Sequence, residues 1–223
     1  MRRAFTLIEL LIVIAIIAIL ALIAIPNFLE SQTRAKVGRA MADMRSYGMA
    51  IEAYTTDYGR PIMSYRYLTS VPPDSTCPVQ STMSQTNARR WSERTLTTPI
   101  AYITSIPIDP FCDKGYEDSR VGVTPDSPRQ ETYNYEDYVP PCWWYTGPVQ
   151  TPILYRNGVL WSMQCAGPTR NRGVYNVRAL IGAQNHTSQP GLFFNAYDPT
   201  NGTMSFGVII RTNKGGWTGT IYK

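Results

Sequence analysis

Residues 5–25 read FTLIELLIVIAIIAILALIAI, an apolar stretch in which Glu9 is the only ionisable side chain. A helix rises about 1.5 Å per residue, so a stretch of this length spans roughly 30 Å, the thickness of the hydrocarbon layer of a bilayer. Arg2 and Arg3 precede it, and positive charge tends to stay on the cytoplasmic side. The stretch therefore predicts one transmembrane helix followed by an extracytoplasmic domain. A cleaved secretory signal is the alternative, but its apolar core usually has about 7–15 residues and no acid.

Glu9 is the feature of this stretch that calls for a partner. An ionised carboxylate at the centre of a membrane helix costs on the order of 2.5–3.5 kcal/mol, and less near the end of the helix. A nearby cation would offset that cost. The other interpretation is that the carboxylate only reaches back to the membrane interface. The residues alone leave both interpretations open.

The apolar stretch and its flanks resemble a known processing motif. Residues 2–20 read RRAFTLIELLIVIAIIAIL and residues 25–28 read IPNF, and both resemble type IV pilins and type II secretion pseudopilins. The resemblance implies cleavage before Phe5 by a membrane aspartyl prepilin peptidase, N-methylation of the new terminus, and assembly by inner-membrane machinery. The filament core would consist of packed N-terminal helices. The family usually has Gly before the cut, where this chain has the small residue Ala4.

The resemblance also assigns an assembly role to Glu9. Its carboxylate would pair with the new amino group of Phe5, either on an adjacent subunit or on its own chain. The precursor would lie in a bacterial inner membrane with its N-terminus in the cytoplasm, and the product would be a periplasmic or extracellular filament.

Pro26 follows the apolar run, and in a continuous helix it lacks the N–H that would bond to Leu22. We expect a kink or a loosening of the helix there, unless Pro26 only marks the exit from the membrane. Beyond it, large side chains recur every three or four residues, which predicts an amphipathic helix over 27–59 with Gly59 as its stop. These side chains should form the face on which the head packs, and they are Val37, Met41, Met44, Tyr47, Ile51, Tyr54 and Tyr58.

The remaining residues, 60–223, predict a polar globular head with long irregular loops. Residues 60–131 show little periodicity, although 96–111 resemble a recurring segment of secretion pseudopilins, closest to the G-type major pseudopilins. Strands are predicted at 132–135 and 206–211, and residues 153–155 and 159–161 flank Arg156-Asn157-Gly158 as a β-hairpin would. The predicted fold class is therefore α+β, a type IV pilin-like long helix packed against a small antiparallel sheet. The predicted domains are a leader at 1–4, a transmembrane or filament-core helix at 5–26, the amphipathic helix and the head.

Four cysteines lie in the head, an even number in a domain that meets an oxidising compartment. Two disulfides are expected, Cys77 with Cys112 and Cys142 with Cys165, a preference that rests only on nearness in sequence. Four cysteines allow three connectivities. A four-cysteine zinc site is the alternative, and the absence of a closely spaced Cys pair weighs against it.

No enzymatic, cofactor or metal site is predicted. His186 is the only histidine, and no nucleophile and base or phosphate-binding glycine loop can be assigned. Residues 167–173 contain two arginines and no acid, which disfavours calcium. The net charge is +5, but the positive residues do not form a long basic run. No specific nucleic acid is therefore expected as a partner.

The sequence therefore predicts a structural subunit of a type IV pilus-like or secretion-pseudopilus-like filament. Its expected partners are further copies of itself in a helical homopolymer, the prepilin peptidase and methyltransferase, the assembly machinery, and the membrane before assembly. The alternative is a minor pilin or a single-span surface module whose head binds another cell, sugar or DNA.

Overall fold

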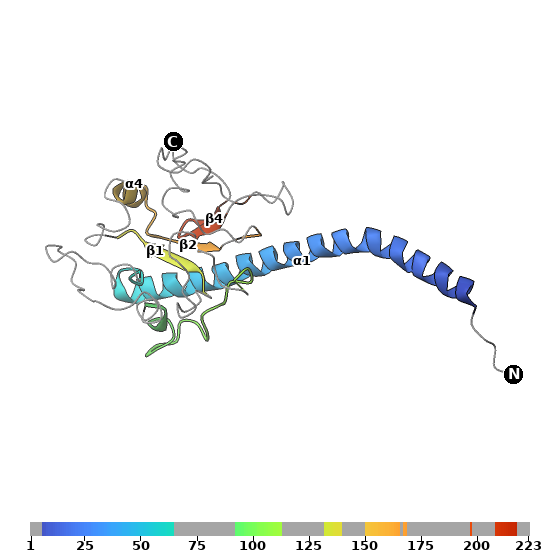
Figure 1. The fold of residues 1–223 in the computed structure, drawn as a ribbon. Helices are drawn as coiled ribbons and strands as arrows, with labels where there is room; N and C mark the ends of the chain where they lie inside the picture. Colours follow the sequence, from blue (N-terminus) through green and yellow to red (C-terminus); the bar gives the residue numbers. More distant parts are fainter. Residues whose placement is uncertain are drawn as a thin grey trace, which may run out of the picture.

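The structure is a computed structural model that describes residues 6–64, 92–112, 132–139, 150–165, 167–168, 197 and 208–217. A long helix runs along the C-terminal head and continues well beyond it (Figure 1). The predicted α+β class, a long N-terminal helix with a small antiparallel sheet, is confirmed. The elements are α1 (Leu7–Tyr58), β1 (Asn134–Asp137), α4 (Gln150–Arg156), β2 (Trp161–Cys165), β3 (Ile209–Thr212) and β4 (Gly215–Trp217).

Helix α1 is one continuous helix of 52 residues that contains both the apolar and the amphipathic part. It begins after Thr6 and ends where the sequence predicted, because Gly59 adopts a φ of 71°. That left-handed conformation is favourable for glycine, and the Gly59 amide donates to the Thr55 carbonyl at 2.8 Å. Since no break separates the two parts, the position of the head fixes the direction in which the apolar part projects.

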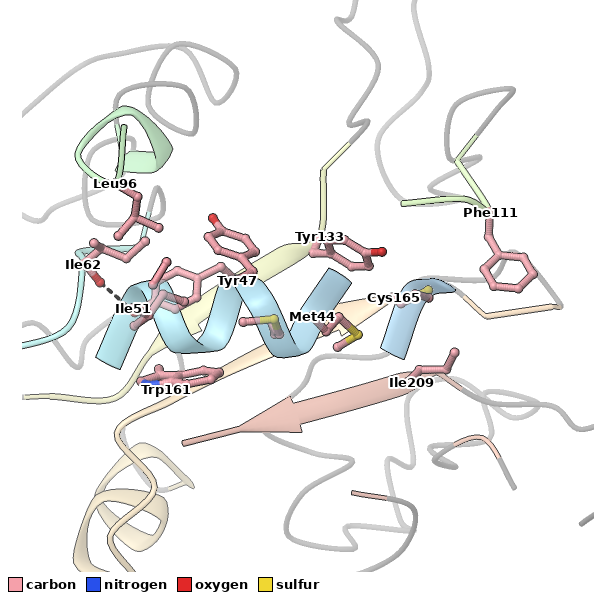
Figure 2. Packing of buried hydrophobic residues seen from close by; sticks show 14 of the residues in the cluster. Met44, Tyr47, Ile51, Ile62, Leu96, Phe111, Tyr133, Trp161, Cys165 and Ile209 are labelled. Carbon is pink, nitrogen blue, oxygen red and sulfur yellow. Dashed lines mark hydrogen bonds between the residues drawn. The ribbon is translucent and has the colours of Figure 1, made fainter. Parts of the chain in front are cut away.

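The head packs on one face of the C-terminal part of α1. Met44, Tyr47 and Ile51 are buried there, as the spacing predicted, among aromatic and aliphatic side chains from the strands and loops (Figure 2). Small residues complete this face, since Ala40 and Gly48 are also buried. The prediction for the last turn of this face was wrong: the Tyr58 side chain is 52% exposed and stacks on Tyr54 at 4.4 Å between ring centroids.

The sheet is a four-stranded antiparallel meander in the order β1-β2-β3-β4. Its registers place Tyr135 opposite Met163 and Met163 opposite Arg211. Directly opposed residues of neighbouring antiparallel strands point to the same face, so these three residues share one face of the sheet. Met163 and Tyr135 belong to the core cluster that includes α1, so this face is the one turned toward the helix.

The β-hairpin predicted around Arg156-Asn157-Gly158 is wrong. The first half of that segment is the helix α4, and Asn157 and Gly158 close its C-terminus. Gly158 has a φ of 73° and donates from its amide to the Tyr155 carbonyl at 2.8 Å. A glycine with positive φ serves a helix C-cap as well as a hairpin turn, so the Asn-Gly signal did not distinguish the two.

A hairpin that the sequence analysis missed joins β3 to β4 through Asn213 and Lys214. The Asn213 side chain accepts from the Leu160 amide at 3.0 Å and donates to the Gly158 carbonyl at 2.9 Å. The turn between the last two strands is therefore tied to the end of α4.

The segment that follows α1 is fixed to β1 by buried hydrogen bonds. The Ser64 amide donates to the Asp137 carboxylate at 2.8 Å, and the Tyr135 hydroxyl donates to the Ile62 carbonyl at 2.8 Å. The pKa of Asp137 is raised to about 7, mainly by burial and to a smaller extent by the neighbouring Glu136, while the Ser64 amide and Arg60 oppose the shift. The folded head therefore binds a proton that the unfolded chain releases at lower pH.

We predict that the head loses stability as pH rises from about 4 to about 7, because the pKa of an unfolded aspartate is about 3.9. The unfolded state then loses its proton first, which lowers the free energy of unfolding by up to about 4 kcal/mol, with little further change above that interval. Asp137→Asn keeps an acceptor for Ser64 but does not titrate. Denaturant unfolding of the full chain in detergent should show the pH-dependent loss in the wild type and a much smaller loss in Asp137→Asn. Equal losses in both proteins would contradict the prediction.

Candidate functional site

The candidate site is the N-terminal part of α1, residues 7–29, which projects beyond the described part of the head (Figure 1). Almost every side chain in it is exposed, from Leu7 at 84% to Leu29 at 56%. Within the residues that the structure describes, α1 is the one helix long and apolar enough to cross a membrane, and none of its apolar window is buried. An exposed apolar surface of this extent requires a cover of lipid or protein.

Thr6 and Glu9 form a capping box at the start of α1. The Glu9 amide donates to Thr6 Oγ1 at 3.4 Å, and the Thr6 amide donates to Glu9 Oε2 at 2.9 Å. The Thr6 hydroxyl also donates to Oε2, at 2.7 Å. The box satisfies backbone amides that the first turn of a helix leaves without partners, and the carboxylate lies at the end of the helix dipole that favours negative charge.

Glu9 keeps one carboxylate oxygen for another donor. Both bonds from Thr6 reach Oε2, and among the described residues no donor contacts Oε1. Phe5 and Ala4, the residues predicted at the processing site, lie outside the described residues. The pairing of Glu9 with the Phe5 amine therefore stays a prediction, and the capping geometry leaves an acceptor for it.

Pro26 lies inside α1, with helix on both sides. Its ring nitrogen carries no hydrogen, so the bond from residue 26 to the Leu22 carbonyl is missing from the backbone ladder. Figure 1 shows α1 as a gently curved helix through its N-terminal part. The kink at Pro26 therefore stays a prediction.

The structure describes one cysteine of each predicted disulfide. Cys112 and Cys165 are buried, and the Cys165 thiol donates to Asp109 Oδ1 at 3.2 Å. Cys77 and Cys142 lie outside the described residues, so both disulfides remain predictions.

The part of the chain that the structure describes was predicted to hold no metal site. It contains no group of three or more His, Cys, Asp or Glu side chains that could hold a metal ion. His186 and most of the 167–173 stretch fall outside it.

The capping box is a functional feature that the sequence analysis missed. Its signal was present, because Thr6-Leu7-Ile8-Glu9 is a Thr-x-x-Glu sequence directly before an apolar run. From the sequence, Glu9 was interpreted as a charge in the apolar stretch that pairs with the Phe5 amine. The structure adds a second role at the first helical turn.

A comparison with protein families is consistent with this site. Residues 1–25 match the family model described as the prokaryotic N-terminal methylation motif. No curated protein and no solved structure shows significant similarity to the chain. The match supports a type IV pilin-like or pseudopilin protein, and the motif implies processing by a prepilin peptidase and assembly into pilus-type filaments.

We predict that Thr6→Val loosens the first turn of α1, because valine has a similar shape but cannot accept the Glu9 amide. A lost cap costs about 1 kcal/mol, so the Glu9 amide should exchange with solvent about fivefold faster in detergent micelles. Thr33→Val is the control, since Thr33 bonds only to the Leu29 carbonyl inside the helix. Unchanged exchange at Glu9 in Thr6→Val would contradict the capping role.

Proposed function

We propose that this chain is a structural subunit of an extracytoplasmic filament of the type IV pilus or type II secretion pseudopilus kind. The observation that carries the proposal is the exposed apolar part of α1, directly continuous with the helix that anchors the head. The methylation motif over residues 1–25 supports the same conclusion.

The apolar part suits two successive environments. Before assembly, lipid covers its side chains, and its length of about 30 Å matches a bilayer. In a filament, the same side chains pack against those of neighbouring subunits, and the transfer from lipid to protein costs little because both surroundings are apolar. The heads remain on the outside, since each is attached at the other end of a single helix.

Processing before Phe5 creates the cation that Glu9 lacks in the precursor. A free α-amino group has an ordinary pKa of about 7.7–8.0 and is largely protonated at neutral pH. Two charges about 4 Å apart attract by roughly 4 kcal/mol at an effective dielectric of 20, before desolvation is counted. One charge left alone in an apolar core costs several kcal/mol. The main effect of the pair between Glu9 and the Phe5 amine is therefore to determine where a subunit docks. Its net contribution to the stability of the filament is smaller.

We predict that subunits isolated from the filament begin at Phe5 and carry one N-terminal methyl group. Intact-mass measurement and N-terminal sequencing would detect the loss of residues 1–4. Subunits that still begin at Met1 would contradict this prediction, and Ala4→Gly should then be tested because glycine is the usual residue before the cut in the family.

We also predict that Glu9→Gln produces a processed, membrane-held chain that assembles at least about tenfold less filament. Glutamine preserves the capping box, because its side-chain oxygen also accepts from the Thr6 amide, so this variant removes only the charge. Glu30→Gln is the matched control, since Glu30 lies on the same helix and pairs with Arg34 at 2.5 Å. The yield of sheared filaments measures the effect. Wild-type yield from Glu9→Gln would mean that the charge has no role in assembly.

A further inference from the structure

Arg211 on β3 crosses α1 at a position where the helix has no side chain. A Cβ atom at Gly48 would lie 3.0 Å from Arg211 Nε and 3.0 Å from the ring of Trp161. Both distances are shorter than normal van der Waals contacts, so even alanine would push the arginine away from the helix. Glycine is unfavourable inside a helix, and here its role is to admit Arg211.

Among the described residues, none accepts a hydrogen bond from Arg211 in this position. Its Nε is buried and makes no hydrogen bond. Glu52, which lies one helical turn after Gly48 on α1, accepts instead from Trp161 Nε1 at 2.7 Å, and no ion pair joins Glu52 to Arg211 within 4.0 Å. A partly buried guanidinium is thus left incompletely satisfied, which is energetically unfavourable.

A second arginine adds positive charge at the same place. Arg45 precedes Gly48 by three residues and Glu52 by seven, so the three residues follow one face of α1. Burial lowers the pKa of Arg211, Arg45 lowers it further, and Glu52 opposes both. In the part of the chain that the structure describes, the one negative charge that opposes the two arginines here is Glu52, whose carboxylate already accepts from the Trp161 indole.

We propose that Arg45 and Arg211 form a binding site for an oxyanion, either a phosphate or a carboxylate group. Guanidinium groups bind such anions with paired, charge-assisted hydrogen bonds, and an anion between the two arginines would relieve their repulsion. Arg45 is exposed and Arg211 is half-buried, so a ligand can approach from solution. This inference does not depend on the proposed filament function.

Membrane phospholipid is not the source of this anion. Arg45 lies 16 residues beyond Leu29, the last residue of the apolar part. At about 1.5 Å per residue, this separation places Arg45 roughly 24 Å farther along α1 than the membrane-spanning part. The ligand is therefore a dissolved anion or an acidic group of another protein molecule.

The test measures the thermal midpoint of the full chain in uncharged detergent during titration with inorganic phosphate and, separately, with acetate. Chloride holds the ionic strength constant, because salt alone screens the two arginines. We expect a saturable rise of the midpoint with at least one of the two anions. Arg45→Gln should weaken the apparent affinity roughly tenfold or more, the worth of one charge-assisted hydrogen bond. Arg34→Gln should leave the affinity unchanged, since Arg34 is exposed and pairs with Glu30 elsewhere on α1.

The two anions distinguish the sources of the ligand. A stronger response to phosphate supports a dissolved phosphate compound, and a stronger response to acetate supports a carboxylate, such as an acidic side chain of another subunit. Arg45 is exposed, so its substitution tests the site without disturbing the core, whereas Arg211→Met tests it from the buried side. No saturable response to either anion would overturn the proposal. An equal response in the wild type and Arg45→Gln would also overturn it, and would leave Arg211 as a packing residue only.

Discussion

The exclusion of apolar side chains from water determines which surroundings this molecule requires. Residues 7–29 present leucine and isoleucine side chains on all sides of a helix, and the head covers almost none of them. Exposed apolar surface costs about 25 cal/mol per Å² in water. Over the whole helix, this free-energy cost far exceeds the net stabilisation from any single hydrogen bond in the structure. The chain therefore needs a membrane or other protein molecules around this part.

The rest of α1 determines where the head lies relative to the apolar part. The same helix continues into the head, where Met44, Tyr47 and Ile51 are covered by the sheet and the loops (Figure 2). Gly48 lets β3 approach closely, and Gly59 ends the helix where the chain turns toward β1. The head and the apolar part are thus joined by helix alone, and Pro26 removes one backbone hydrogen bond from that connection.

The sequence predicted the features that depend on local pattern. The apolar run, the three-to-four-residue spacing of Met44, Tyr47 and Ile51, and the stop at Gly59 each arise within a few neighbouring residues. The strands around residues 134 and 209 were also predicted, since their β-branched and aromatic residues favour extended backbone.

Features that depend on distant parts of the chain could not be predicted in this way. Asn157-Gly158 fits either a hairpin or a helix end, and in the structure it closes α4, whose Leu154 side chain is fully buried. Tyr58 continues the apolar spacing of α1, but its side chain stays half exposed and stacks on Tyr54. The contact between Gly48 and Arg211 joins residues 163 positions apart, and no local pattern announces it. The Thr6 and Glu9 capping box was readable, because its Thr-x-x-Glu signal is local.

Cryo-electron microscopy of filaments sheared from cells that produce this chain would test the central claim most directly. The account predicts a helical polymer in which residues 7–29 of neighbouring copies pack along the axis, with the heads outside and Glu9 of one copy near the Phe5 amine. A chain that remains in the membrane fraction and forms no filament would contradict the account. A filament whose subunits contact one another only through their heads, with the apolar helices absent from its axis, would contradict it as well.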